Sequence, residues 1–346
     1  MILGGMQRPA AESPGLRLIN MSTAYRDSQL VYVATKLGVA DALTDGPRSA
    51  ADIARAVGAS SEALERVLRG LYLLGVFDQL EDGRFAQTDA SELLTARATA
   101  GVREAVILWG QEQFRAWADL LKTVTTGEPA FRQLFGDPFD YYDHQRETGE
   151  LFDAFMEAGA RQLAGIILNC DLPDRGTIVD IAGGEGRALA TILQALPHAR
   201  GLLLERPPVA EKARVILRAE GVIDRAVVVA GDCRESAPRG GDVYVLMRVL
   251  HDWDDRSAGA IISAIGRAMQ PASRLLVVQR LMPERLTRDP LHALVVDSDL
   301  MQMVYNGGRE RTLEEYRELM HSAGLVIHQS MNFFGGMSVI EARLAL

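Results

Sequence analysis

Glycines and a carboxylate surround the end of a short apolar run at residues 177–181. Asp180 lies in this run, and three glycines follow it: Gly183, Gly184 and Gly186. Glycine lets a ligand approach the backbone closely, and ligands of parallel sheets bind at the carboxyl ends of the strands. Because a helical pattern begins near Arg187, the spacing predicts a strand-to-helix turn that binds a nucleotide-like ligand.

Two further acidic residues follow the next two apolar runs. Glu205 closes the run 201–205, where a carboxylate can accept hydrogen bonds from both hydroxyls of a ribose. Asp232 follows the run 226–230, between Gly231 and Cys233, and could accept from an adenine amino group. A helix N-cap or a solvated loop residue is the alternative for each acid alone. Three acids at successive strand ends favour a cofactor site.

The acidic charge of the glycine turn helps to identify the class of cofactor that binds there. Glu185 lies between Gly184 and Gly186 and would repel the pyrophosphate of a dinucleotide. A cationic sulfonium ligand without a phosphate suits an acidic turn better. We therefore expect S-adenosylmethionine, and an NAD-dependent dehydrogenase is a remote alternative.

A histidine follows a fourth apolar run, at residues 243–247. The imidazole of His251 has an unperturbed pKa of about 6.5, so it can take a phenolic proton at neutral pH. The alternative for His251 alone is a helix-capping or buried histidine. The sequence 251–255, His-Asp-Trp-Asp-Asp, offers possible metal ligands, but Trp253 and the crowding on one turn favour a strand-to-helix cap. We expect no metal.

These residues require a sheet that brings strand ends together. Short apolar runs alternate with helical patterns through the C-terminal half, which predicts a parallel sheet with both faces covered. The expected strands are 177–181, 201–205, 226–230, 243–247 and 274–278, with helices at 188–195 and 258–269. Runs at 324–328 and 338–342 come close together in the sequence, as a final antiparallel pair would.

The N-terminal half has a different pattern. Helical segments at 49–57 and 60–74 precede a predicted hairpin, 76–80 with 84–87, whose Asp-Gly turn suits positive φ. Together they predict a winged helix. We expect this domain at residues 1–100, a helical linker rich in aromatic residues at 101–170, and the α/β domain at 171–346.

Composition limits the possible partners. The 346 residues carry a net charge of -9, which argues against a surface that neutralises phosphates. The predicted recognition helix begins with Glu62 and Glu65, so a winged-helix transcription regulator is a remote alternative. The two cysteines lie far apart, and the chain has neither a signal-like apolar stretch after Met1 nor an apolar run of membrane-spanning length. We expect a cytoplasmic protein.

Several segments resemble the plant-type O-methyltransferase family and its bacterial relatives that act on phenols and polyketide aromatics. The resemblance covers nearly the whole chain: Asn20 to Tyr25, Leu37 to Leu43, the glycine turn, the His251 segment and Asn306 to Thr312. It implies a Rossmann-like class I methyltransferase sheet and an N-terminal winged-helix domain that forms a homodimer and helps to close the partner's pocket. The implied reaction is methylation of a hydroxyl on a small aromatic or polyketide natural product.

The resemblance also implies roles for individual residues. His251 matches the general base, Glu310 matches a supporting acid, and Arg248 would contact the carboxylate of the cofactor. The other expected cofactor contacts are Arg206, Gly231 and Cys233, beside the acids and glycines named above. The expected substrate contacts are Trp109, Phe155, Met156, Asp252, Met301, Gln302 and Asn306.

One position departs from the family pattern. Gln279 stands where the family often has a glutamate that orients the histidine. An amide can accept from an imidazole N–H, but it has no charge with which to stabilise an imidazolium. The departure keeps open an alternative in which the chain retains the cofactor but catalyses hydroxylation, decarboxylation or a pericyclic reaction.

Overall fold

The computed structural model describes residues 13–345, so the opening residues Met1 to Gly5 lie outside the described part. The chain forms two compact units. The first contains the residues up to Arg115 together with Glu147–Ala158, and the second contains Ala116–Arg146 and the residues from Gly159 onward. The helical segment 101–170 therefore contributes to both units.

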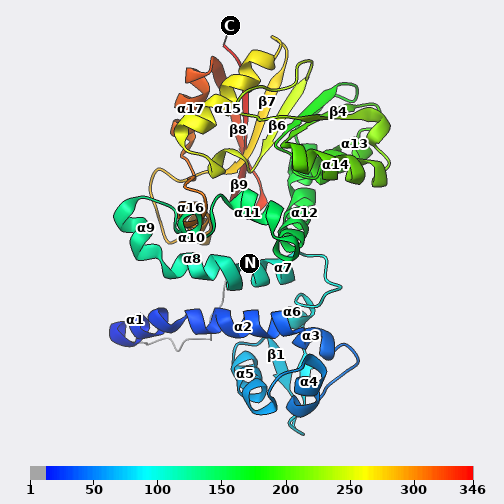
Figure 1. The fold of residues 1–346 in the computed structure, drawn as a ribbon. Helices are drawn as coiled ribbons and strands as arrows, with labels where there is room; N and C mark the ends of the chain where they lie inside the picture. Colours follow the sequence, from blue (N-terminus) through cyan, green and yellow to red (C-terminus); the bar gives the residue numbers. More distant parts are fainter. Residues whose placement is uncertain (1–12, 346) are drawn as a thin grey trace. The chain divides into compact units, whose positions relative to one another are not determined.

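The first unit begins with two helices, α1 (Pro14–Thr23) and α2 (Tyr25–Leu37), and continues as a winged helix (Figure 1). Ser49 and Ser60 cap the two helices of the helix-turn-helix through their hydroxyl oxygens. Buried side chains of these helices and of the hairpin form the core of the unit. The elements are α3 (Val39–Ala42), α4 (Ala50–Val57), α5 (Ser61–Leu73), β1 (Phe77–Gln79), β2 (Phe85–Gln87), α6 (Asp89–Glu92) and α7 (Val102–Leu108).

A series of helices joins the two units. A π-helical turn, η1 (Trp109–Gln113), contains a kink at Gln111. Four short helices follow: α8 (Phe114–Ala118), α9 (Leu120–Thr126), α10 (Ala130–Phe135) and α11 (Pro138–His144). The long helix α12 (Arg146–Leu168) then leads into the sheet. None of the helices between residues 13 and 345 is long and apolar enough to cross a membrane.

The second unit contains a seven-stranded sheet in the order β5-β4-β3-β6-β7-β9-β8. The first five strands in this order are parallel, and β9 pairs antiparallel with both β7 and β8. The strands are β3 (Thr177–Ile181), β4 (Arg200–Glu205), β5 (Ala226–Ala230), β6 (Val243–Met247), β7 (Arg274–Arg280), β8 (Leu325–Asn332) and β9 (Met337–Leu344). The helices are α13 (Arg187–Ala195), α14 (Pro207–Ala219), α15 (Asp255–Ala268), α16 (Pro290–Tyr305) and α17 (Leu313–Ser322).

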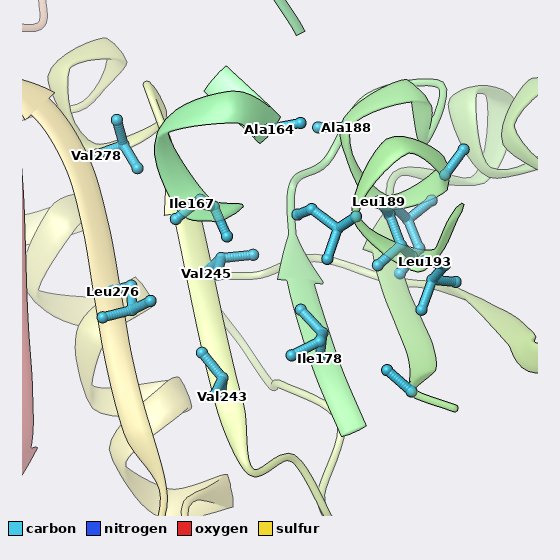
Figure 2. Close-up of a cluster of buried hydrophobic side chains, with 14 of the residues drawn as sticks. Ala164, Ile167, Ile178, Ala188, Leu189, Leu193, Val243, Val245, Leu276 and Val278 are labelled. Atoms are coloured by element: carbon cyan, nitrogen blue, oxygen red, sulfur yellow. The ribbon is translucent and has the colours of Figure 1, made fainter. Parts of the chain in front are cut away.

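Helices cover both faces of this sheet. Side chains of α12 and α13, such as Ile167 and Leu189, pack against Ile178 of β3 and Val245 of β6 (Figure 2). On the opposite face, α15 and α17 pack against the alternate residues of the same strands, such as Val179. The predicted fold class, with its N-terminal domain and Rossmann-like sheet, is confirmed.

Candidate active site

The glycine turn after β3 brings the backbone close to a buried carboxylate. Ala182 adopts a φ of 53°, one of two positive φ values at non-glycine residues of the described chain. A Cβ on Gly183 would lie 2.3 Å from Oδ2 of Asp180 and 2.6 Å from Leu203. Gly184 has a φ of +58° but open space around it. The turn therefore leaves a cradle over Asp180 that a side chain at position 183 would fill.

Asp180 is fully buried, and neither of its carboxyl oxygens has a hydrogen-bond partner among the described residues. Burial, with a contribution from nearby Glu205, raises the pKa of Asp180 to about 7. A buried polar atom without a partner costs free energy that a ligand can recover. The site therefore favours a cationic or hydrogen-bond-donating group, which fits the sulfonium and ammonium of S-adenosylmethionine.

Glu205 lies at the end of the neighbouring strand β4. One of its oxygens accepts from the backbone N–H of Gly184 at 3.3 Å, and the other accepts from the N–H of Arg206 at 2.5 Å. Burial raises the pKa of Glu205. These two bonds fix the carboxylate beside the glycine turn, and each oxygen keeps a further lone pair for a ligand hydroxyl.

Two residues expected to contact the cofactor are each paired with a protein side chain. The guanidinium of Arg206 pairs with Asp143 at 2.9 Å and lies 5.4 Å from the ring centre of Phe139, both on α11. The carboxylate of Asp232 pairs with the Arg234 guanidinium at 2.5 Å, which holds the pKa of Asp232 below its usual range. An adenine amino group at Asp232 would therefore compete with Arg234.

The neighbours of Asp232 support the strand end. The N–H of Gly231 donates to the carbonyl of Glu205 at 2.9 Å, which extends the pairing of β4 and β5. Burial raises the pKa of the Cys233 thiol to about 12, so this cysteine is a neutral thiol at physiological pH. The Arg234 guanidinium lies 4.8 Å from the ring centre of Trp253. A cation over an aromatic face is a favourable contact.

His251 is buried in the 3-10 turn η3 (Leu250–Asp252) that follows β6. Its Nδ1 lies 3.1 Å from Oε1 of Glu310 and 3.0 Å from Nε2 of Gln302. A carboxylate is the stronger acceptor, so Nδ1–H donates to Glu310. Nε2 is then the unprotonated nitrogen, and it lies 3.5 Å from Oδ1 of Asp252.

Glu310 is hydrogen-bonded to three polar side chains, those of His251, Arg248 and Ser298. The same oxygen that faces His251 accepts from Arg248 at 2.7 Å and from Ser298 at 2.6 Å. Burial opposes ionisation of Glu310, but the bonds to His251 and Arg248 outweigh it and lower its pKa to about 2. Glu310 is therefore ionised at neutral pH, and its charge can stabilise an imidazolium.

The structure gives Arg248 and Gln279 partners other than those expected. Arg248, which was expected at the cofactor carboxylate, pairs with Glu310 and donates to Ser298 at 2.9 Å. Gln279 is fully buried beside Arg248, and no hydrogen bond joins it to His251. With its amide oxygen turned toward the backbone, it accepts from the N–H groups of Val249 and Leu250 at 3.1 and 3.0 Å. These donors begin η3, where a helix has no partners of its own.

The expected substrate contacts of the second unit lie around His251. Gln302 is one of them, and Asn306 donates from Nδ2 to Oδ1 of Asp252 at 3.0 Å. Burial raises the pKa of Asp252. Met301 is partly exposed on α16, next to Gln302. Asp252, held by Asn306, therefore lies on the Nε2 side of His251, and Gln302 lies on the Nδ1 side.

The other expected substrate contacts belong to the first unit. The ring of Trp109 in η1 meets that of Phe155 edge-on, with centres 5.9 Å apart. Trp109 is 50% exposed and Met156 is 49% exposed, which is unusual for such large apolar side chains. This surface suits contact with a planar ring.

Two residues that hold the histidine turn were not predicted. Ser298 is buried on α16 and bonds both Arg248 and Glu310. Arg311 is fully buried and donates to the carbonyls of Leu250 and Trp253, each at 2.8 Å. The conspicuous basic and acidic run 309–312 pointed to this segment, but nothing in the sequence distinguishes Arg311 from an exposed arginine.

In the range 13–345 no group of three or more histidine, cysteine or acidic side chains is placed to hold a metal.

Comparisons with known proteins show the family of this chain. Residues 117–326 match the model of the O-methyltransferase domain, and residues 19–97 match the O-methyltransferase dimerisation domain. The chain is 37% identical over 328 residues to the phenazine O-methyltransferase PhzM of Lysobacter antibioticus, covering 94% of this chain and 95% of that protein. It is 39% identical to the mitomycin biosynthesis 6-O-methyltransferase of Streptomyces lavendulae, covering 92% and 91%.

Further similarities concern the cofactor and the acceptor atom. A solved O-methyltransferase from neocarzinostatin biosynthesis, in complex with S-adenosylmethionine and 2-hydroxy-5-methyl naphthoic acid, superposes with a TM-score of 0.83 at 30% identity, covering 97% of this chain and 100% of that one. The phenazine-1-carboxylate N-methyltransferase of Pseudomonas aeruginosa is 30% identical, covering 90% and 92%. The similar proteins therefore include methyltransferases for oxygen and for nitrogen.

Proposed function

The chain belongs to the O-methyltransferase family, and on that premise we propose that it methylates a hydroxyl of a small aromatic or polyketide natural product with S-adenosylmethionine. One observation carries the proposal. The buried, unpartnered Asp180 at the glycine turn and the His251–Glu310 pair lie at the carboxyl ends of the adjacent strands β3 and β6. A cation-binding acid beside an oriented base is what transfer of a methyl cation to a phenol requires.

The glycine turn has the residues to hold the cofactor. S-adenosylmethionine, when bound, supplies an electrophilic methyl group on a sulfonium. We propose that Asp180 faces the cationic end, that Gly183 and Gly184 allow close approach, and that Glu205 accepts from the ribose hydroxyls. Asp232, flanked by Gly231 and Cys233, is proposed at the adenine end, with Arg234 displaced from it.

His251 is proposed as the general base through Nε2. Glu310 accepts the Nδ1 proton and thereby fixes the tautomer that leaves Nε2 free to take the proton of the acceptor hydroxyl. Arg248 and Ser298 hold Glu310 in position. Holding the acceptor oxygen near the methyl can contribute roughly 7 kcal/mol, so positioning supplies as much as proton removal.

The neutral side chain at position 279 is compatible with this reaction. The alternative of a non-methylating relative was suggested by the missing glutamate charge. Glu310 supplies a carboxylate with a pKa of about 2 in direct contact with Nδ1. Gln279 supports the turn that carries His251 through Val249 and Leu250, which we propose as its role.

Acceptor contacts are proposed for each unit by itself. In the second unit, Asp252, Asn306 and Gln302 are the proposed contacts near the base, and Met301, next to Gln302 on α16, is a further proposed contact. Trp109, Phe155 and Met156 are proposed to contact the ring, because they expose aromatic and thioether surface.

The assembly and the compartment are proposals as well. A match to the dimerisation domain over residues 19–97 and the exposed apolar side chains of α1 and α2 support a homodimer. The acidic composition supports the expectation that nucleic acid is not a partner. We propose that the enzyme acts in the cytoplasm, in the biosynthesis of an antibiotic-like natural product.

Mass spectrometry of acceptor panels tests the proposal. Purified enzyme is incubated with S-adenosylmethionine and matched pairs of hydroxy- and amino-substituted naphthalenes and phenazines. The expected result is a mass gain of one methyl on hydroxy compounds, with S-adenosylhomocysteine formed in equal amount. Methylation of only the amino members would reassign the acceptor atom to nitrogen. A product formed without consumption of the cofactor would support the non-methylating alternative.

A further inference from the structure

Arg280, the last residue of β7, is a cationic side chain without a partner. No hydrogen bond or ion pair joins it to any residue in the range 13–345, and its Nε is buried without an acceptor. Nearby arginines differ, since Arg248 pairs with Glu310 and Arg311 bonds two carbonyls and Asp255. A buried guanidinium N–H that lacks an acceptor costs free energy unless a ligand supplies one.

The alternation of the strands places Arg280 on the same face of the sheet as the cofactor acids. Ile178, Leu203, Val245 and Val278 pack on the face covered by α12 and α13 (Figure 2). Because side chains two residues apart point to the same face, Asp180, Glu205, Met247 and Arg280 share that face at the carboxyl ends. Met247 does pack against this core.

These four residues form a diagonal row across four adjacent strands, β4-β3-β6-β7. Asp180 pairs with Val245 and Met247 pairs with Val278, so Arg280 lies four residues further along the strand direction than Asp180. Neighbouring strands lie about 4.8 Å apart and residues rise about 3.3 Å along a strand, so the Cα of Arg280 is about 16 Å from the Cα of Asp180 and about 16 Å from that of Glu205. The row contains two acids at one end, an apolar thioether in the middle and a guanidinium at the other end. A cofactor held by the two acids leaves the positions over Met247 and Arg280 to a second molecule.

The positive charge at this end of the row has few acidic neighbours. Glu310 interacts with Arg280 electrostatically, but its hydrogen bonds go to Arg248, Ser298 and His251. Asp297 on α16 also interacts with Arg280 at longer range, and it is exposed and outside ion-pair distance. The preceding residue Gln279 is neutral. A guanidinium in this setting is suited to a carboxylate, which it can bind in a two-pronged manner.

We propose that Arg280 is the carboxylate subsite of the acceptor, so that the preferred substrate is a hydroxylated aromatic carboxylic acid. The inference rests on the proposed function, because the acceptor is placed by the methyl-transfer site. His251 follows β6 and would face the hydroxyl, while Arg280 at the end of β7 binds the acid group. The α-carboxylate of the cofactor is the other source of the same chemistry, and the experiment separates the two.

Calorimetry with matched probes tests the assignment. The wild type and Arg280→Met, both saturated with S-adenosylhomocysteine, are titrated with 1-hydroxy-2-naphthoate and with 1-hydroxy-2-naphthamide. We expect Arg280→Met to weaken binding of the acid about 30-fold, about 2 kcal/mol at about 1.4 kcal/mol per tenfold, and to change binding of the amide less than about threefold. Arg280→Lys should retain part of the preference for the acid. Asp297→Asn is the matched control and should leave the preference intact.

The remaining outcomes decide against the assignment. A wild type that binds S-adenosylhomocysteine but does not prefer the acid over the amide would overturn it, as would equal losses for both probes in Arg280→Met. If Arg280→Met weakens S-adenosylhomocysteine but not 5′-methylthioadenosine, which lacks the carboxylate, the subsite belongs to the cofactor. A wild type that binds no S-adenosylhomocysteine would instead refute the proposed function.

Discussion

The charge on Glu310 sets the chemistry of His251. Three donors, on Arg248, Ser298 and His251, converge on one carboxylate oxygen of Glu310. The pKa of about 2 keeps this carboxylate ionised at every pH at which an enzyme of this kind works. The imidazole is therefore held in one tautomer, and the positive charge that it gains on taking a proton has a counter-charge in contact.

Removing that charge should slow the chemical step without affecting the cofactor. We expect Glu310→Gln to lower kcat roughly a hundredfold, within the usual contribution of a general base, and to leave the Kd for S-adenosylhomocysteine unchanged. Steady-state kinetics and calorimetry measure the two quantities. Ser298→Ala, which keeps the carboxylate, is the control and should cost less than about tenfold. A kcat for Glu310→Gln within threefold of the wild type would show that the charge is dispensable.

Gln279 should matter for its oxygen rather than for any charge. Gln279→Met leaves the buried N–H groups of Val249 and Leu250 without an acceptor, so we expect the free energy of unfolding to fall by about 2 kcal/mol. Gln279→Glu keeps an acceptor and should lose less than about 1 kcal/mol. Urea unfolding of the three proteins measures this. If the methionine variant is as stable as the glutamate variant, the backbone bonds contribute nothing.

Residue type and position pointed to the candidate site residues but not to their partners. Asp180, Glu205, His251 and Glu310 could be proposed because each lies near the end of a strand or in a distinctive motif. The partners of Arg248 could not, because Ser298 lies fifty positions away on α16 and only the packing of that helix brings them together. Arg206 and Asp232 were expected at the cofactor for their position, whereas local arginine and aspartate neighbours pair with them.

At the scale of elements, two glycines of the turn are required for different reasons: Gly183 leaves no room for a Cβ, whereas Gly184 has a positive φ. Gly183→Ala would place a Cβ against Asp180 and Leu203, so we expect binding of S-adenosylhomocysteine to weaken at least about tenfold. A Cβ in Gly184→Ala meets open space, so the only cost is the conformational free energy of a positive φ, roughly 1 kcal/mol. Titration calorimetry on both variants makes the comparison. Equal losses of S-adenosylhomocysteine affinity in the two variants would mean that the open space at position 183 over Asp180 does not contribute to binding.

The elements themselves followed closely from the sequence. The apolar runs at 177–181, 226–230 and 243–247 coincide with β3, β5 and β6. In β3 and β6 nearly every residue is buried, and strands covered on both faces are almost continuously apolar. The final antiparallel pair extends further than its apolar centre, to Leu325–Asn332 and Met337–Leu344. The exposed polar residues of an edge strand such as β8 do not form an apolar run, so the sequence does not show where the strand ends. The π-helical turn at Trp109–Gln113 likewise had no signal in the sequence.

At the scale of the whole molecule, Asp180 should couple stability to pH. Its pKa of about 7 exceeds the ordinary value of 3.8, so the folded protein without ligand binds a proton that the unfolded chain has released. Stability is therefore lost as the pH rises from about 4 to about 7 and levels off above that, by on the order of 4 kcal/mol.

The variant Asp180→Asn isolates this contribution. The difference in unfolding free energy between Asp180→Asn and the wild type, measured in urea at pH 5, 6, 7 and 8, should grow in favour of the variant with rising pH. The same variant should bind S-adenosylhomocysteine poorly, since the counter-charge is gone. A difference that is constant across the pH range would mean that Asp180 is ionised normally in the folded protein.

The proposed homodimer makes a separate prediction at this scale. Leu18, Ile19 and Met21 on α1 are each more than half exposed, in a segment that overlaps the match to the dimerisation domain. Burying such side chains between two chains is favourable, at about 25 cal/mol per Å². We expect light scattering to give twice the chain mass for the wild type and a shift toward monomer for Leu18→Asp with Ile19→Asp. Val215→Asp, which changes an exposed apolar residue on α14, is the control. A monomeric wild type would refute the dimer.

Single-turnover methyl transfer tests the central claim most directly. Enzyme in excess is mixed with S-adenosylmethionine carrying a deuterated methyl group and with an accepted phenol, and the labelled product is followed by mass spectrometry for the wild type and His251→Ala. The predicted result is transfer of one intact labelled methyl to the hydroxyl by the wild type and a rate at least about a hundredfold lower for the variant, with S-adenosylhomocysteine still bound at wild-type affinity. Undiminished transfer by His251→Ala, or a wild-type product without the label, would contradict the assignment of His251 as the base of an O-methyltransferase.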